Sequence, residues 1–353
     1  AFEHTSRYDN MIFNFLNSRL QGDDPSALAR NLSLHFLKVQ DLRYGENPHQ
    51  KAAFYRDAAE ATGLANMKQL NGKELSYNNI LDLNNGIDCV KDFDNPAAVV
   101  IKHNNPTGLA EDKDLATAYR FAHGADKLSA FGGIIALNRK VDGKTATAIV
   151  KSGFMECVLA PGYETGALKQ LKEKKNLRVI QFNFADIKKN DFDFKKVKGG
   201  LLFQQEDSLN IGLGDLKVVT KQKPTRAQLE SLLFAWKVVK CVKSNAIVLV
   251  KGRHVVGIGC GQTSRVGSVQ IAIEKAGKEA KGSFLASDAF LPKVDNVVLA
   301  AKAGIKAIIQ TGGSIADEDV ITEANRRKLA MVLTGARHFK DRKSTRLNSS
   351  HRT

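Results

Sequence analysis

The sequence contains few cysteines, and none lies close to another. Cys89, Cys157, Cys241 and Cys260 are widely spaced, and each lies in or beside an apolar stretch. Without a C-x-x-C pair the chain offers neither a cysteine zinc site nor a thioredoxin-type redox motif. We therefore expect buried, reduced thiols, which fit a reducing compartment, and no zinc cofactor.

Long apolar runs and a secretion signal are also missing. No uninterrupted apolar run approaches the roughly 20 residues that a membrane-spanning helix needs. The first residues, AFEHTSRYDN, lack the basic-then-apolar order of a signal peptide. We expect a soluble, cytoplasmic (cytosolic) protein without a membrane partner.

Aromatic residues are scarce in a chain that carries a formal net charge of +16. Phe, Tyr and Trp make up 7% of the 353 residues, and the lysines are scattered along the sequence. A nucleic-acid-binding surface would gather its basic residues on one stripe, or interleave them with aromatics for stacking. The charge suits small polyanionic substrates drawn into a positive cleft, so we favour small anionic ligands over nucleic acid.

Two nucleotide-binding signatures are absent, and so is the zinc-deaminase signature. The glycine run GIGCGQTSR (257–265) has Gln262 where a dinucleotide fingerprint requires glycine or alanine, and no acidic residue ends a partner strand about 20 residues on. Neither G-x-x-x-x-G-K-[ST] nor H-x-E with P-C-x-x-C occurs. These absences argue against a dinucleotide-binding enzyme, a P-loop NTPase and a zinc deaminase.

The chain does contain an alternation of strand and helix signals. Residues 1–40 look helical and amphipathic, and apolar strands such as 96–101 then alternate with helical patterns such as 112–124. A helix is expected after a Thr225 cap, and residues 246–261 predict a hairpin. This alternation predicts an α/β fold with largely buried strands.

The two halves of the chain resemble each other. SAF (129–131) and SDAF (287–290) each precede a helix, an apolar strand and a glycine-containing turn in the same order. An earlier apolar strand leads through a polar turn into a helix in each half. The sequence therefore predicts two related α/β domains in tandem, divided near residues 198–215.

Polar side chains gather where the predicted strands end. Lys102 and His103 follow the apolar residues VVI (99–101) directly, and a turn comes next. Open α/β sheets bind ligands at such strand ends. Each polar stretch alone is compatible with an ordinary turn or helix cap. Several in one chain, rich in Arg, Lys, His and Asn, supply the base, cation and amide donors that metal-free group transfer requires.

A set of short motifs identifies a family resemblance. The motifs are RYGENPHQ, ELSYNN, IKHNNPTG, SAFGGIIALNR, KSNAIVLVK, GIGCGQTSRV, ASDAFLP and RHF. In order and approximate spacing they resemble the aminoimidazole carboxamide ribonucleotide (AICAR) formyltransferase domain of the bifunctional purine-biosynthesis family, over about residues 41–340. FEHTSRYDNMI (2–12) is similar to the end of that family's IMP cyclohydrolase domain, of which the rest is absent.

The resemblance implies a fold and an assembly. It implies two tandem cytidine-deaminase-like α/β domains without the zinc motif, at 41–198 and 199–340. Residues 1–40 would then be a junction segment after the missing cyclohydrolase domain, and 341–353 a disordered, non-native tail. Members of the family are similar in forming homodimers whose active sites lie across the interface.

The resemblance also implies a reaction. A formyl group passes from 10-formyltetrahydrofolate to the 5-amino group of AICAR, giving FAICAR and tetrahydrofolate on the route to IMP. The full-length protein would also carry IMP cyclohydrolase. His103 would be the general base, for which an imidazole with an ordinary pKa of about 6.5 is suited. Lys102 would stabilise negative charge and help to protonate the departing folate nitrogen, and Asn245 would hold the formyl oxygen.

Further residues are assigned to binding by the same resemblance. The nucleotide site would contain Arg43, Tyr44, Asn79, Phe131, Gly132, Arg265 and Arg337. The folate site would contain Phe290, Pro292 and Asn296, and Asp288 would lie beside a monovalent cation, potassium.

One departure and two rival functions complete the sequence hypothesis. Lys293 and Val294 replace the Phe-Arg of many family members in FLPKVD (290–295), so we assign them no folate contact. The main alternative is a catalytically silent folate- or nucleotide-binding module, against which the intact set of Lys102, His103 and Asn245 argues. A basic RNA-binding protein is favoured only by the charge.

Overall fold

The computed structural model describes residues 2–20, 28, 30–58, 62–187 and 191–340. The predicted tail at 341–353 lies outside these residues, as do parts of the predicted junction segment. None of the described helices is both long and apolar enough to cross a membrane.

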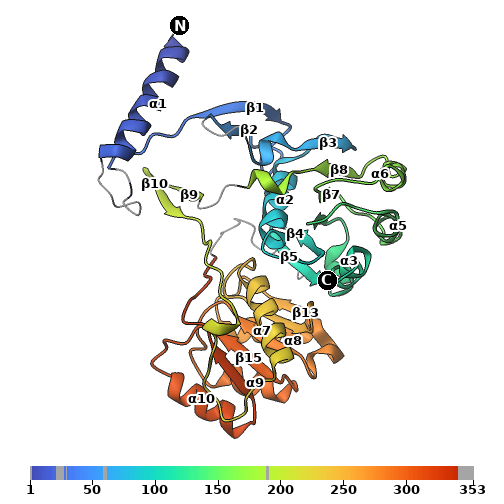
Figure 1. Cartoon of the computed structure of the whole chain (residues 1–353), viewed down its shortest axis with the longest axis vertical. Helices are drawn as coiled ribbons and strands as arrows, with labels where there is room; N and C mark the ends of the chain where they lie inside the picture. Colours follow the sequence, from blue (N-terminus) through green and yellow to red (C-terminus); the bar gives the residue numbers. More distant parts are fainter. Residues whose placement is uncertain (1, 21–27, 29, 59–61, 188–190, 341–353) are drawn as a thin grey trace.

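A mixed sheet of 12 strands forms the centre of the molecule (Figure 1), which confirms the α/β class. From one edge to the other the strands are β11 (Lys217–Val218), β16 (Ala330–Leu333), β15 (Ala307–Gln310), β14 (Phe284–Ser287), β12 (Ile247–Lys251), β13 (His254–Gly259), β5 (Asn105–Glu111), β4 (Ala97–Lys102), β6 (Ile134–Leu137), β7 (Cys157–Ala160), β8 (Arg178–Gln181) and β3 (Lys68–Asn71). The helices are α1 (Phe2–Leu20), α2 (Tyr77–Val90), α3 (Leu115–Gly124), α4 (Lys127–Ala130), α5 (Gly143–Lys151), α6 (Thr165–Lys172), α7 (Arg226–Val239), α8 (Arg265–Ala276), α9 (Asp295–Lys302) and α10 (Asp317–Arg326).

The strand topology of the first half recurs in the second. In the first half, β4 pairs antiparallel with β5 and β6, β6–β7–β8 are parallel, and β3 closes the edge antiparallel. In the second half, β12 pairs antiparallel with β13 and β14, β14–β15–β16 are parallel, and β11 closes the edge. The halves meet at a seam where β13 pairs with β5, His254 opposite Ala110. Figure 1 shows the first half above the second, with β5 and β13 at the junction.

Helices cover both faces of the sheet because its strands are apolar on both sides. One buried cluster spans both halves and contains α2 and α7, including Leu83 and Trp236. The opposite face carries two separate clusters, one under α3, α5 and α6 and one under α8, α9 and α10. Burial on both faces explains why the strands read as continuous apolar runs in the sequence.

Helix caps follow the sequence signals closely. Thr225 caps α7, and its hydroxyl accepts the N–H of Gln228 while the Gln228 side chain accepts the Thr225 N–H. Ser264 caps α8, and its hydroxyl accepts the N–H of Gly267. These reciprocal bonds satisfy N–H groups that the first turn of a helix leaves without partners.

The helical prediction for residues 1–40 is wrong in its last part. Residues 36–40 lie in strand β1 (Phe36–Leu42), which pairs antiparallel with β2 (Ala52–Asp57). Pairing with β2, the next strand along the chain, overrode the helical spacing of the apolar residues. A second two-stranded ribbon, β9 (Phe192–Val197) with β10 (Gly200–Gln205), lies near the first, and the rings of Phe36 and Phe194 are 5.9 Å apart.

A close contact between strand and helix occurs at the same place in both halves. A Cβ on Gly108 of β5 would lie 2.1 Å from the carbonyl oxygen of Ala122 in α3, and one on Gly257 of β13 would lie 2.2 Å from that of Ala272 in α8. Each hairpin also carries a bulge beside this glycine. Only glycine allows the helices to approach this closely.

Gly257→Ala is therefore expected to lower the free energy of unfolding by about 3 kcal/mol, because helix backbone must move to admit the methyl group. Chemical denaturation measures this. Gly166→Ala in α6 is the matched control, since a Cβ there would have no neighbour within 4 Å, and it should cause no loss. Equal stability of the two variants would contradict the close contact.

Candidate functional site

The turn between β4 and β5 carries Lys102 and His103. Lys102 is the last residue of β4 and half-buried, whereas His103 is exposed. His103 and Asn104 have φ of 50° and 60°, a left-handed conformation that is uncommon outside glycine and that two-residue hairpin turns require. The turn thus presents a histidine at a position where the backbone is strained, a condition that often marks a functional site.

Lys102 lies against the loop that follows α4. Its Nζ donates to the carbonyl oxygen of Phe131 at 2.6 Å. Gly132 has φ of 67°, and a Cβ there would lie 3.2 Å from Lys102 Nζ. The structure therefore brings together three predicted site residues, Lys102, Phe131 and Gly132, next to His103.

An acidic residue that the sequence did not single out lies under the turn. Asp82 of α2 accepts the backbone N–H of Asn104 at 2.5 Å. Burial raises the pKa of Asp82 to about 6, although the N–H groups of Asn104 and His103 and the charge of Lys102 each act to lower it. No local pattern marks this residue, because its role depends on how α2 packs against β4.

A second group of predicted residues gathers in the other half. Arg265, the first residue of α8, is buried, and its guanidinium donates to Asn245 Oδ1 at 2.8 Å, to Ser287 Oγ at 2.9 Å and to the Asp288 carboxylate. The Asn245 amide in turn donates to the carbonyl oxygen of Gln262 at 2.8 Å. Arg265 thus orients Asn245.

Asp288 is fully buried at the centre of this group. One carboxylate oxygen accepts from Arg265 and from the Ala246 N–H, and the other accepts from the Ser244 hydroxyl. A carboxylate that already neutralises a guanidinium is a poor ligand for another cation, so these residues do not fit a potassium ion bound at this carboxylate. Within the described residues, no three His, Cys, Asp or Glu side chains form a metal-binding group.

The two groups approach each other at the seam. The N–H of Lys243, two residues before Asn245, donates to Asn105 Oδ1 at 3.2 Å, and the Asn105 amide donates to the His103 carbonyl oxygen at 3.3 Å. One short chain of hydrogen bonds therefore connects the His103 turn to the loop that carries Asn245.

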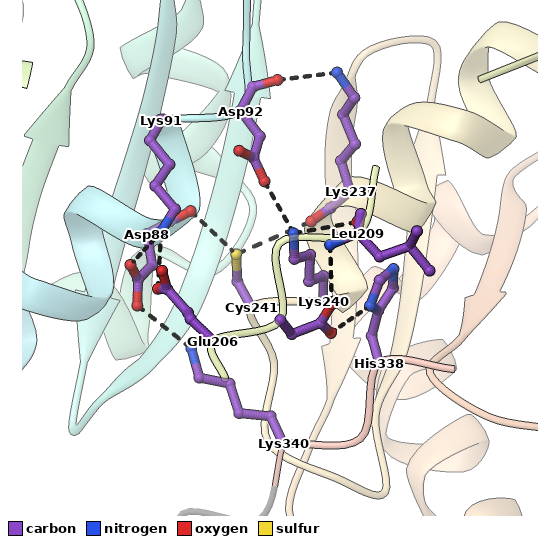
Figure 2. Close-up of polar contacts among 11 residues, drawn as sticks. Asp88, Lys91, Asp92, Glu206, Leu209, Lys237, Lys240, Cys241, His338 and Lys340 are labelled. Carbon is purple, nitrogen blue, oxygen red and sulfur yellow. Dashed lines mark hydrogen bonds and ion pairs between the residues drawn. The ribbon is translucent and has the colours of Figure 1, made fainter. Parts of the chain in front are cut away.

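Charged side chains hold the same seam on the α2 side (Figure 2). Lys91 lies 3.0 Å from Asp88 and 2.9 Å from Glu206, and Lys340 reaches Asp88 at 3.8 Å. Burial would lower the pKa of Lys91, but the charges of Asp88 and Glu206 outweigh it and raise the pKa. These residues line part of a cavity of about 240 Å³.

The RHF motif extends from this seam. His338 is buried, and its Nδ1 lies 2.6 Å from Asp207 Oδ2. Arg337 is exposed, with its guanidinium 5.9 Å from the centre of the Phe339 ring. Arg337 is therefore free of protein ion pairs among the described residues and is accessible to an anion.

The remaining predicted nucleotide residues lie near the start of α2. The Arg43 guanidinium is 4.8 Å from the centre of the Tyr44 ring and donates to the Tyr44 hydroxyl at 3.2 Å. Asn79 is buried in the capping box of α2, where its side chain accepts the Ser76 N–H at 3.0 Å. Asn79 thus has a structural role, and exposed Arg43 forms a separate pair with half-buried Tyr44.

The predicted folate residues follow β14. Phe290 and Pro292 are exposed, whereas Asn296 in α9 is 2% exposed. The Asn296 amide donates to Asp295 at 2.7 Å, but its Oδ1 is buried and has no hydrogen-bond partner among the residues that the structure describes. A buried acceptor without a donor is costly in a folded protein, so a polar group of a ligand would be favoured here.

Fold and site together define an α/β protein with a repeated sheet, in which a lysine–histidine turn and an arginine-bound asparagine lie at the seam. The profile of the AICARFT/IMPCHase bienzyme family matches residues 1–275. The chain belongs to this family. It is similar to the bifunctional purine biosynthesis protein PurH of Acetivibrio thermocellus, with 52% identity over 343 residues, and to that of a Thermoanaerobacter species, with 50% identity over 340. Each match covers 96% of the chain and 66% of the relative, so the chain spans just under two thirds of the length of these relatives.

Proposed function

We propose that the chain transfers a formyl group from 10-formyltetrahydrofolate to the 5-amino group of AICAR, giving FAICAR and tetrahydrofolate. The observation that carries this proposal is the left-handed turn at the end of β4, which presents Lys102 and His103 beside the seam to the Asn245 loop. The names of the relatives agree with a role in purine biosynthesis. IMP cyclohydrolase activity is assigned to the part of these relatives that lies outside the match.

Each catalytic residue has a distinct role in the proposed reaction. His103 accepts the proton of the amino group as its nitrogen attacks the formyl carbon. Asn245 stabilises the oxyanion that forms on the formyl oxygen, for which its amide must exchange the Gln262 carbonyl for the substrate. Lys102 compensates the developing negative charge and helps to protonate the leaving folate nitrogen. No step is assigned to a metal ion.

The binding residues are assigned according to the anionic or aromatic substrate group that each could contact. Arg43 and Arg337, both exposed, suit a ribose phosphate, since a guanidinium binds phosphate in a bidentate manner. Arg265 acts through Asn245 in this arrangement. For folate, the exposed ring of Phe290 with Pro292 offers an apolar contact, and the buried Asn296 Oδ1 offers an acceptor.

The domain and assembly predictions belong to the same proposal. The repeated topology supports two cytidine-deaminase-like domains at 41–198 and 199–340. Exposed apolar side chains on β9–β10, such as Phe192, Phe194 and Leu202, support a homodimer, which light scattering tests. An active site across the interface would bring Arg43 and Phe290 of different copies to the catalytic residues.

Turnover and ligand-dependent melting test the proposed function. The purified chain is expected to release tetrahydrofolate from AICAR and 10-formyltetrahydrofolate. AICAR at about 100 times its Kd should stabilise the fold by about 2.7 kcal/mol, seen as a rise in Tm, because it binds only the folded state. RNA at equal phosphate concentration should cause no rise. AICAR binding without turnover would favour the silent binding module, and a rise with RNA alone would favour the RNA-binding protein.

A further inference from the structure

The turn that carries His103 is not stable by itself. His103 and Asn104 both have positive φ, and a two-residue turn of this kind strongly prefers Asn-Gly or Gly-Gly. The chain contains no glycine between Lys102 and Gly108. Neighbouring residues must therefore hold the turn in its conformation.

Two side chains of α2 supply that support. Asp82 and Asn85 are three residues apart, so both lie on the same face of the helix. Asp82 accepts the N–H of Asn104 at 2.5 Å, and the Asn85 amide donates to the carbonyl oxygen of Asn104 at 2.9 Å. The helix thus binds both polar backbone groups of Asn104.

Asp82 does more than hold Asn104. Its carboxylate also lies close enough to the backbone N–H of His103 and to Lys102 for each of them to lower its pKa. A single anionic side chain therefore contacts the backbone on which His103 stands and lies near the Lys102 ammonium. A carboxylate can accept two N–H groups and attract a cation at the same time.

We propose that Asp82 is a positioning residue for formyl transfer, which fixes the left-handed turn so that His103 and Lys102 meet the reacting atoms in productive geometry. This inference rests on the proposed function, because its test measures kcat for formyl transfer. Asp82 acts through the turn and through Lys102.

If Asp82 only stabilised the fold, a neutral residue in its place should make the protein less stable. The burial of its ionised carboxylate predicts the opposite, so the two roles can be told apart. The groups that face it are Lys102, the amides of His103 and Asn104, and the thiol of Cys157 in β7. Because its pKa in the folded protein is about 6, above the ordinary value for Asp, ionised Asp82 destabilises the fold at pH 8. This penalty starts to shrink as the pH falls below about 6 and disappears below the ordinary pKa of an aspartate, 3.8. A neutral amide at this position should fold better than the carboxylate.

Asp82→Asn is therefore expected to lower kcat about 10- to 100-fold, because small displacements of catalytic groups have effects of this size. KM for AICAR should stay within about threefold, because Asp82 does not touch the substrate. The Tm at pH 8 should rise. Asp82→Glu restores the charge and should recover part of kcat.

Asp114→Asn is the matched control. Asp114 also accepts a backbone N–H, that of Thr117 at 3.1 Å, but at the start of α3. Its kcat should equal that of the parent. A parent-like kcat for Asp82→Asn would overturn the proposal, and so would a loss of kcat that follows a lower Tm or that Asp82→Glu does not reverse.

Hydrogen exchange of the backbone distinguishes failure of this inference from failure of the proposed function. The amides of residues 103–105 should exchange faster in Asp82→Asn than in the parent, whatever reaction the protein catalyses. Unchanged exchange overturns the positioning role even where the parent is active. If the parent does not turn over, the proposed function fails, and faster exchange still supports Asp82 as the residue that fixes the turn.

Discussion

His103→Ala is expected to lower kcat for formyl transfer by about 10³-fold, within the range that general acid–base catalysis contributes. The imidazole is exposed at the tip of the β4–β5 turn, where it can reach a bound amine. AICAR binding, measured by the rise in Tm, should persist, because the cationic groups proposed to bind the phosphate remain. The loss should therefore lie in kcat rather than in KM.

Imidazole added to the solution is expected to restore part of the activity of His103→Ala, since it can occupy the space and take the proton. His4→Ala, which changes the same side chain on the exposed surface of α1, should have parent activity. Equal turnover by parent and His103→Ala would remove His103 as the base while leaving the reaction itself in place.

Asp288→Ala is expected to have the largest effect on stability. It leaves the Arg265 guanidinium uncompensated, with the two side chains of the pair only 7% and 0% exposed. Breaking a buried ion pair from one side costs about 3–5 kcal/mol. The Ser244 hydroxyl and the Ala246 N–H lose an acceptor as well. Chemical denaturation should show this loss in the free energy of unfolding.

Two further variants make the stability prediction specific. The double variant Asp288→Ala with Arg265→Leu should lose less than Asp288→Ala alone, because it removes the uncompensated charge. Asp41→Ala breaks an exposed pair, in which the side chain of Lys38 is 50% exposed and that of Asp41 is 78% exposed. This variant should leave the free energy of unfolding almost unchanged. Equal losses for Asp41→Ala and Asp288→Ala would show that burial does not determine the strength of the pair.

The sequence predicted those features that depend on local chemistry. Thr225 and its capping box, the apolar hairpin strands and the turn after Lys102 all follow from residues that are neighbours in the chain. The β1 strand was missed because nothing within its own residues shows that it pairs with β2. Helical spacing alone could not show that pairing.

The site was predictable to a similar extent. Lys102 and His103 are adjacent, so their shared position could be expected from the strand that precedes them. Arg265 was expected to be an anion-binding residue at a helix start, but its guanidinium turns inward to Asp288, 23 residues away. Asp82 lies 22 residues before Asn104, and only the packing of α2 on the sheet brings them together.

The hairpin occurs twice in the chain, so its two copies can be compared residue by residue. Gly108 and Gly257 occupy the same place in their strands. Each pairs with the residue that lies two positions before a lysine on the neighbouring strand, which is Lys102 for Gly108 and Lys251 for Gly257. At the tips of the two turns, by contrast, one copy has His103–Asn104 and the other has Gly252–Arg253. If the two halves descend from one ancestral unit, the shared glycines are residues that the fold requires in each copy. The turn residues then differ because one copy specialised after duplication.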